Sequence, residues 1–186
     1  MLGDDNIEYT ILDDDTICAI RGPWDEFAAE NDAASLDVSS VLGRPLWEYI
    51  SGEEVRAIYR VLLHRVRTTG KRVSFPFHCD SPGRVRLFRM AVSRPGAEFV
   101  RFSSTLLRSQ DRPAVPLLDV NVPRSREVLL VCSVCKLFRC GQDWVPVERA
   151  LAALGVMEGG QVPSLSHGLC PDCLETMLQS IVRPAE

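Results

Sequence analysis

The sequence predicts an α+β fold, in which a five-stranded antiparallel sheet with short helices precedes a small four-cysteine zinc-binding module that contains two helices. Over the first 110 residues, two β-like runs come before several helical segments and three more β-like runs. Near the C-terminus, two Cys-x-x-Cys pairs enclose a further helical segment. We therefore divide the chain into a domain at 1–110, a proline-containing linker at 111–126 and a metal-binding module at 127–186.

The elements of the first domain follow from local patterns. Residues 7–12 and 16–22 read as strands around a turn-forming Asp run, and Pro23 with the acids after it predicts a short helix. Residues 46–70 predict a short helix and then a long one, which Gly70 ends. Three β-like runs separated by Pro-Gly turns then predict an antiparallel meander. The long helix carries an apolar stripe at spacings of three and four, comprising Val55, Ile58, Tyr59, Leu62 and Val66.

This order of elements resembles the PAS sensory domain. The resemblance rests on the "GRPLWEYI" helix, the long helix after it, the "TGK" turn and the two long strands that follow. It implies a sensing or protein-interaction domain, pairing into a homodimer, and a pocket for a small-molecule ligand. Aromatic residues are the candidate walls of that pocket, although they would equally fill an ordinary core. They are Trp47, Tyr49, Tyr59, Phe75 and Phe77.

Four cysteines form the candidate metal site: Cys132, Cys135, Cys170 and Cys173. Two Cys-x-x-Cys turns can complete the tetrahedral sulfur shell that Zn²⁺ prefers, and four protein ligands leave no open position for catalysis. The 34 residues between the pairs exceed the usual spacing, but 143–155 supplies a helix among them. An iron–sulfur cluster would use the same thiolates, as would a redox dithiol, so both remain alternatives to zinc.

Two neighbouring residues have possible supporting roles at this site. His167 is a candidate hydrogen-bond partner of a thiolate or an alternative ligand, and Cys140 is a spare ligand or a redox switch. Cys140 is equally compatible with a small, partly buried apolar side chain. We therefore expect the four paired cysteines to be the primary ligands.

The cysteine-rich segment resembles a C-terminal module of bacterial sensory and response-regulator proteins. The shared features are a Cys-x-x-Cys-Lys start, a Trp-x-Pro-x-Glu helix and a Ser-His-Gly-x-Cys-Pro-x-Cys end. The resemblance implies a bacterial signal-transduction context. It also implies a signalling protein as partner.

Composition excludes other classes of protein. We see no catalytic triad, paired-carboxylate motif or phosphate-binding glycine loop, so the sequence predicts no enzyme. The acidic N-terminus lacks the features of a secretory signal and no apolar run is long enough to span a bilayer, so we expect a cytoplasmic protein without membrane contact. A reducing compartment favours metal binding or redox work by the seven cysteines over structural disulfides.

A basic stretch at 71–110 raises the alternative of a nucleic-acid-binding regulator, although the chain as a whole has a net charge of −4. Strand alternation places Arg84 and Arg86 on the opposite face from Arg89, which weakens the case for one contiguous patch. The sequence therefore disfavours nucleic acid as a partner. The arginines in question are Arg84, Arg86, Arg89, Arg94 and Arg101.

Overall fold

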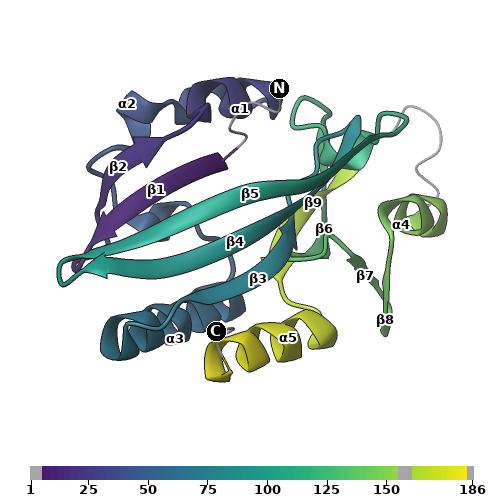
Figure 1. Ribbon diagram of the computed structural model, residues 1–186. Coiled ribbons are helices and arrows are strands. Elements are labelled where there is room, and N and C mark those ends of the chain that lie inside the picture. Colours follow the sequence, from purple (N-terminus) through teal and green to yellow (C-terminus); the bar gives the residue numbers. More distant parts are fainter. Residues whose placement is uncertain (1–5, 155–160, 184–186) are drawn as a thin grey trace.

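A computed structural model describes residues 6–154 and 161–183 of the 186-residue chain (Figure 1). Its larger sheet is antiparallel and has five strands in the order β2-β1-β5-β4-β3. The predicted α+β class and five-stranded sheet are therefore confirmed. The strands are β1 (Asn6–Leu12), β2 (Ile17–Arg21), β3 (Val73–His78), β4 (Arg84–Gly96) and β5 (Phe99–Asp111).

Five helical segments connect β2 to β3, and α3 is the longest. Two glutamates lie in the first turn of α3, where the positive end of the helix dipole stabilises their negative charge. Gly70 ends it with φ 67, a left-handed conformation that glycine adopts without strain. The buried stripe contains every predicted residue except the half-buried Tyr59, and adds Leu63. The segments are α1 (Trp24–Glu30), η1 (Ala34–Leu36), α2 (Val38–Val41), η2 (Leu46–Glu48) and α3 (Glu53–Thr69).

One face of this sheet is apolar and carries the main core. Tyr9 of β1 and Phe102 of β5 are paired in register, and their rings stack with centroids 4.6 Å apart. At one end α3 covers the face, where the Tyr59 ring lies parallel to that of Phe102. At the other end α1 covers it, and Phe27 meets Phe88 edge-on. The two helices therefore occupy different parts of one face.

The C-terminal segment contains a second sheet that the sequence did not predict. Its strand order is β8-β7-β6-β9, and β6 pairs parallel to β9. Because β9 is an edge strand, it tolerates Pro163, which has no N–H for a ladder bond. The predicted linker 111–126 ends inside β6. The elements are η3 (Pro116–Leu118), β6 (Arg124–Cys132), β7 (Phe138–Cys140), β8 (Asp143–Val145), α4 (Val147–Leu154), β9 (Val162–Gly168) and α5 (Pro171–Val182).

Gly155, the last residue of the helix predicted at 143–155, lies outside the described residues. Within 6–154 and 161–183, no helix combines the length and apolar character needed to cross a membrane.

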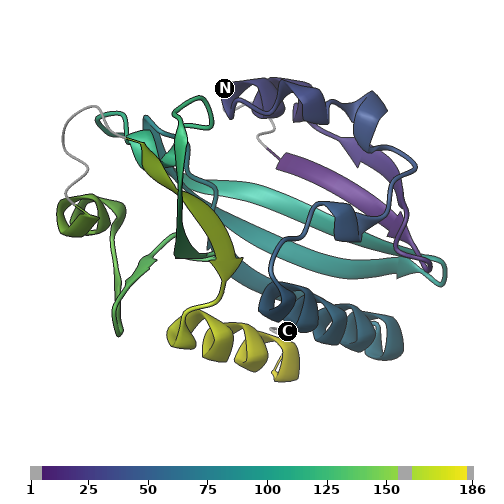
Figure 2. The ribbon, with the colours of Figure 1, turned by 180° about the vertical axis from the view of Figure 1, so that it is seen from behind.

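Helix α5 belongs to the core of the first sheet. It lies beside α3 in both Figure 1 and Figure 2. Its buried Met177 and Ile181 belong to the same apolar cluster as Leu62 and Phe102. A smaller cluster, which includes Phe138 and Ala150, fills the space between the second sheet and α4. The division at 1–110 and 127–186 stays a prediction, but the two parts share one core.

Candidate metal centre

The parallel pairing of β6 and β9 brings the two cysteine pairs together. Cys132 ends β6, Gly168 ends β9, and these two residues are partners in the sheet. Because the two strands are parallel, their C-terminal ends lie at the same end of the sheet. Cys135 lies in the turn after β6, and Cys170 follows β9 by two residues. The two cysteine pairs, which are far apart in sequence, therefore meet at the C-terminal ends of β6 and β9.

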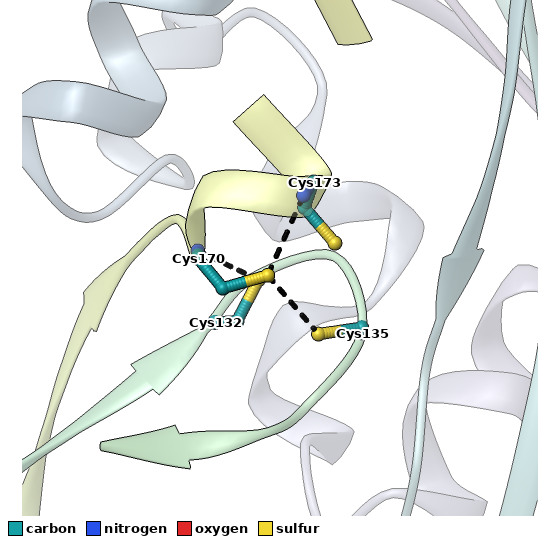
Figure 3. A group of neighbouring side chains, drawn as sticks. All are labelled: Cys132, Cys135, Cys170 and Cys173. Carbon is teal, nitrogen blue, oxygen red and sulfur yellow. Dashed lines mark hydrogen bonds between the residues drawn. The ribbon is translucent and has the colours of Figure 1, made fainter. Parts of the chain in front are cut away.

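The first pair lies on a tight turn. The Lys136 N–H donates to the Cys132 carbonyl over 3.0 Å, and the Cys132 N–H donates to the Leu137 carbonyl over 2.8 Å. Lys136 closes the turn with φ 58, in the left-handed region. This geometry directs the Cys132 and Cys135 sulfurs toward the second pair (Figure 3).

The second pair opens α5. Cys170 is the N-cap residue, and its sulfur accepts a hydrogen bond from the Cys173 N–H over 3.4 Å. Pro171 follows at the first turn, where its fixed φ suits a helix and its missing N–H has no helical partner in any case. The positive end of the helix dipole favours a negatively charged thiolate at this position.

The four sulfurs form one compact cluster, in which all lie within 4.8 Å of one another (Figure 3). A tetrahedral site with metal–sulfur bonds of about 2.3 Å places its sulfurs about 3.8 Å apart. The Cys135 and Cys170 sulfurs are 3.7 Å apart. The Cys170 N–H donates to the Cys132 sulfur over 3.4 Å, a contact that stabilises a thiolate. Number, type and spacing of the ligands therefore fit a metal ion.

Ionisation of the thiols is strongly coupled. Hydrogen bonding from the Cys135 thiol lowers the pKa of Cys132 to about 4. The same shared proton, together with burial, raises the pKa of Cys135 well above its usual value. Burial and the hydrogen bond to Cys170 raise the pKa of Cys173 to about 12. Several thiolates cannot crowd together without a cation, so a bound metal is what would allow all four to ionise.

The first sheet and its long helix hold both cysteine turns in place. The His78 N–H at the end of β3 donates to the Val134 carbonyl over 2.6 Å, inside the first turn. A Glu54 carboxylate oxygen of α3 accepts from the Leu169 N–H over 3.3 Å, next to the second pair. Sequence analysis missed Glu54, because a partner 115 residues away leaves no local signal.

Two glycines permit this close approach. A Cβ on Gly52, whose φ is 89, would lie 2.2 Å from the His167 carbonyl oxygen. A Cβ on Gly168 would lie 3.1 Å from a Leu130 methyl carbon and 3.3 Å from the Glu54 carboxylate. The start of α3 therefore packs directly against the end of β9.

His167 and Cys140 lie outside the sulfur cluster. His167 is half-buried in β9 opposite Val131 and is not among the described ligand atoms that gather within 4.8 Å. Burial lowers the pKa of its ring, and the Lys136 ammonium lowers it further. Cys140 ends β7 and packs against the smaller apolar cluster. The described residues therefore offer a four-cysteine shell without histidine.

The predicted pocket residues are distributed over two regions. A cavity of about 480 Å³ lies between α1 and the apolar face of the first sheet, and Phe77 lines it. Phe75 is buried in the main core. Trp47, Tyr49 and Tyr59 pack against that core as partly buried side chains. The other four aromatic residues fill the core around α3 and do not line this cavity.

The arginines of the basic stretch are distributed over separate contacts. Arg86 is 3% exposed, stacks over the Phe27 ring and donates to the Asn31 side chain. Arg84 pairs with Asp111 at the surface. Arg94 donates to the Arg67 carbonyl. These three arginines are therefore engaged in contacts within the chain, and the nucleic-acid alternative stays a prediction.

No known protein-family model matches the chain, and no curated protein is significantly similar to it.

Proposed function

We propose that the chain is a non-enzymatic cytoplasmic signalling protein of a bacterium, in which a PAS-like sensing or interaction domain is joined to a structural zinc centre. The observation that carries the proposal is the closed cluster of four cysteine sulfurs within 4.8 Å. Four sulfur ligands satisfy tetrahedral zinc and leave no position for a catalytic water. The signal passes to a protein partner or to a second copy of the chain.

The structural role of the metal is to fasten the C-terminal segment to the first sheet. The cluster lies between β6, β9 and the start of α5. The first cysteine turn accepts the His78 N–H at the Val134 carbonyl, and the Leu169 N–H beside the second pair donates to the Glu54 carboxylate. Metal binding would therefore stabilise the interface as well as the second sheet, since binding to the folded state alone adds its free energy to folding.

Metal analysis of purified, untagged protein tests the proposal. We expect about one zinc per chain and no visible absorption. Bound iron with broad visible absorption would indicate an iron–sulfur centre in place of zinc, and would favour the redox alternative. Absence of both metals, with reversible disulfides between the paired cysteines, would favour a dithiol redox protein.

A pair of cysteine variants locates the metal. Cys170→Ser removes a buried ligand, so we expect zinc content to fall well below one per chain and the free energy of unfolding to drop by at least about 3 kcal/mol. Cys18→Ser makes the same chemical change at an exposed thiol of β2 and should leave both unchanged. Equal zinc content in the two variants would contradict the assignment.

A further inference from the structure

A cavity beneath α1 lies on the same face of the first sheet as the main core. Its volume of about 480 Å³ falls within the range of about 300–1,000 Å³ that holds small organic ligands. Its walls come from β1, β3, β4 and β5, from α1 and η1, from the loop after β3, and from Leu118 of η3 and Val120 after it. It lies at the opposite end of the sheet face from the aromatic residues packed around α3.

The walls are mainly apolar, and their aromatic side chains are held in place. The Trp24 indole N–H donates to the Leu36 carbonyl over 2.7 Å, and the Trp24 ring meets Tyr9 edge-on. Tyr9 stacks in turn on Phe102. At the rim, Leu36 and Val120 leave 40% and 61% of their surface exposed. A preformed apolar cavity with exposed apolar side chains at its mouth favours an apolar ligand.

The charged groups of the cavity already have partners. Among the described residues that line the cavity, Asp80 is the charged one. This carboxylate accepts from the Arg86 N–H over 3.0 Å, lies 3.3 Å from the His78 ring and 3.7 Å from Arg112. A charged ligand would lose its hydration here without gaining a free counter-charge, which is costly. The chemistry of the walls therefore selects a neutral molecule.

One polar side chain in the cavity has only a weak partner. Ser104 of β5 lines it, and its hydroxyl donates to the Met90 sulfur over 3.6 Å. A thioether sulfur is a weak acceptor, so a ligand oxygen or nitrogen would make a better one. Ser104 is therefore suited to orient a polar group on an otherwise apolar molecule.

We propose that this cavity binds a neutral, mainly apolar small molecule that carries one hydrogen-bonding group facing Ser104. The inference rests on the proposed sensing function and names the ligand class. Leu118 links the site to the rest of the chain, because it lines the cavity and also packs against the apolar cluster beneath the second sheet. Ligand at this site would thus contact the segment that leads into β6.

Fluorescence titration of the full-length protein with N-phenyl-1-naphthylamine, a neutral apolar dye, tests the proposal. We expect saturable binding with one dye per chain. The anionic dye 8-anilinonaphthalene-1-sulfonate should bind at least tenfold more weakly. Equal affinity for the two dyes would overturn the assignment of a neutral ligand.

Two variants on the same strand locate the binding site. Ser104→Phe fills the cavity and should weaken dye binding at least tenfold. Thr105→Phe puts the same ring on the opposite face of β5, where Thr105 is exposed, and should leave binding unchanged. Val120→Asp places a charge at the exposed rim and should also weaken binding, which keeps the test valid if Ser104→Phe fails to fold. Undiminished binding in a folded Ser104→Phe or in Val120→Asp would refute the site.

Zinc content measured on the same samples separates this inference from the proposed function. Dye binding without zinc would leave the cavity assignment standing and remove the structural zinc centre. Zinc without dye binding would leave the structural zinc centre standing and remove the cavity assignment.

Discussion

Cys132 and Cys170 are the buried half of the sulfur cluster, at 0% and 3% exposed, whereas Cys135 and Cys173 are half-buried. Each buried sulfur also accepts a backbone N–H, from Cys170 and Cys173 respectively. Such contacts to ligand atoms orient the ligands and offset the negative charge that thiolates bring. The protein therefore shields one side of the centre and leaves the other closer to solvent.

The hydrogen bond from the Leu169 N–H to the Glu54 carboxylate can be tested by substitution. Glu54→Ala removes the acceptor of the Leu169 N–H, whereas Glu53→Ala removes a neighbouring carboxylate that is 82% exposed. Both changes take one negative charge from the first turn of α3. We expect Glu54→Ala to lower the free energy of unfolding by about 0.5–1.5 kcal/mol more than Glu53→Ala, the net value of one hydrogen bond.

Chemical denaturation of the two variants measures this difference, and zinc competition with a chelator shows whether it reaches the metal. Faster loss of zinc from Glu54→Ala than from Glu53→Ala would support a role in holding the second cysteine turn. Identical stability and identical zinc release would show that the Glu54 contact contributes nothing.

At the scale of elements, α5 joins the metal centre to the first sheet. Its first turn carries two ligands, and its later turns bury Met177 and Ile181 against the core shared with α3. Leu174, Leu178 and Val182 remain exposed on the same helix. One helix therefore contributes both to the metal site and to hydrophobic packing.

The two faces of α5 differ in their expected response to truncation. Met177 is 1% exposed, so Met177→Ala should cost about 2–5 kcal/mol through lost burial and the cavity left behind. Leu178 is 41% exposed, so Leu178→Ala should change stability by less than about 0.5 kcal/mol. Thermal and denaturant unfolding measure both. Similar losses in the two variants would mean that α5 does not pack on α3 as described.

At the scale of the whole molecule, the sequence suggests a chain of two separable units, and the shared core suggests cooperation between them. A backbone N–H at the end of β3 and the Glu54 side chain of α3 bond to the two cysteine turns. The C-terminal helix completes the apolar cluster of the first sheet. Loss of metal should therefore lower local stability on both sides of the predicted linker 111–126.

Hydrogen exchange with and without a zinc chelator tests this coupling. We expect chelation to speed amide exchange in residues 127–183 and also in the first turns of α3 and at the end of β3, because those segments lose their partners in the cysteine turns. Strand β2 is the edge strand farthest from β3 and β1 is its neighbour, so residues of these two strands serve as an internal reference. Faster exchange confined to 127–183 would favour two independent units.

The sequence by itself determined the elements of the first sheet and the identity of the candidate ligands. Alternating strands, the stripe on α3 and Gly70 are local patterns, and a Cys-x-x-Cys turn needs only four residues to bring its sulfurs together. Only the tertiary structure decided the rest. The pairing of β6 with β9, the Glu54 contact and the location of the cavity depend on residues that are distant in the chain. Such contacts arise from packing of whole elements, and no short stretch of sequence encodes them.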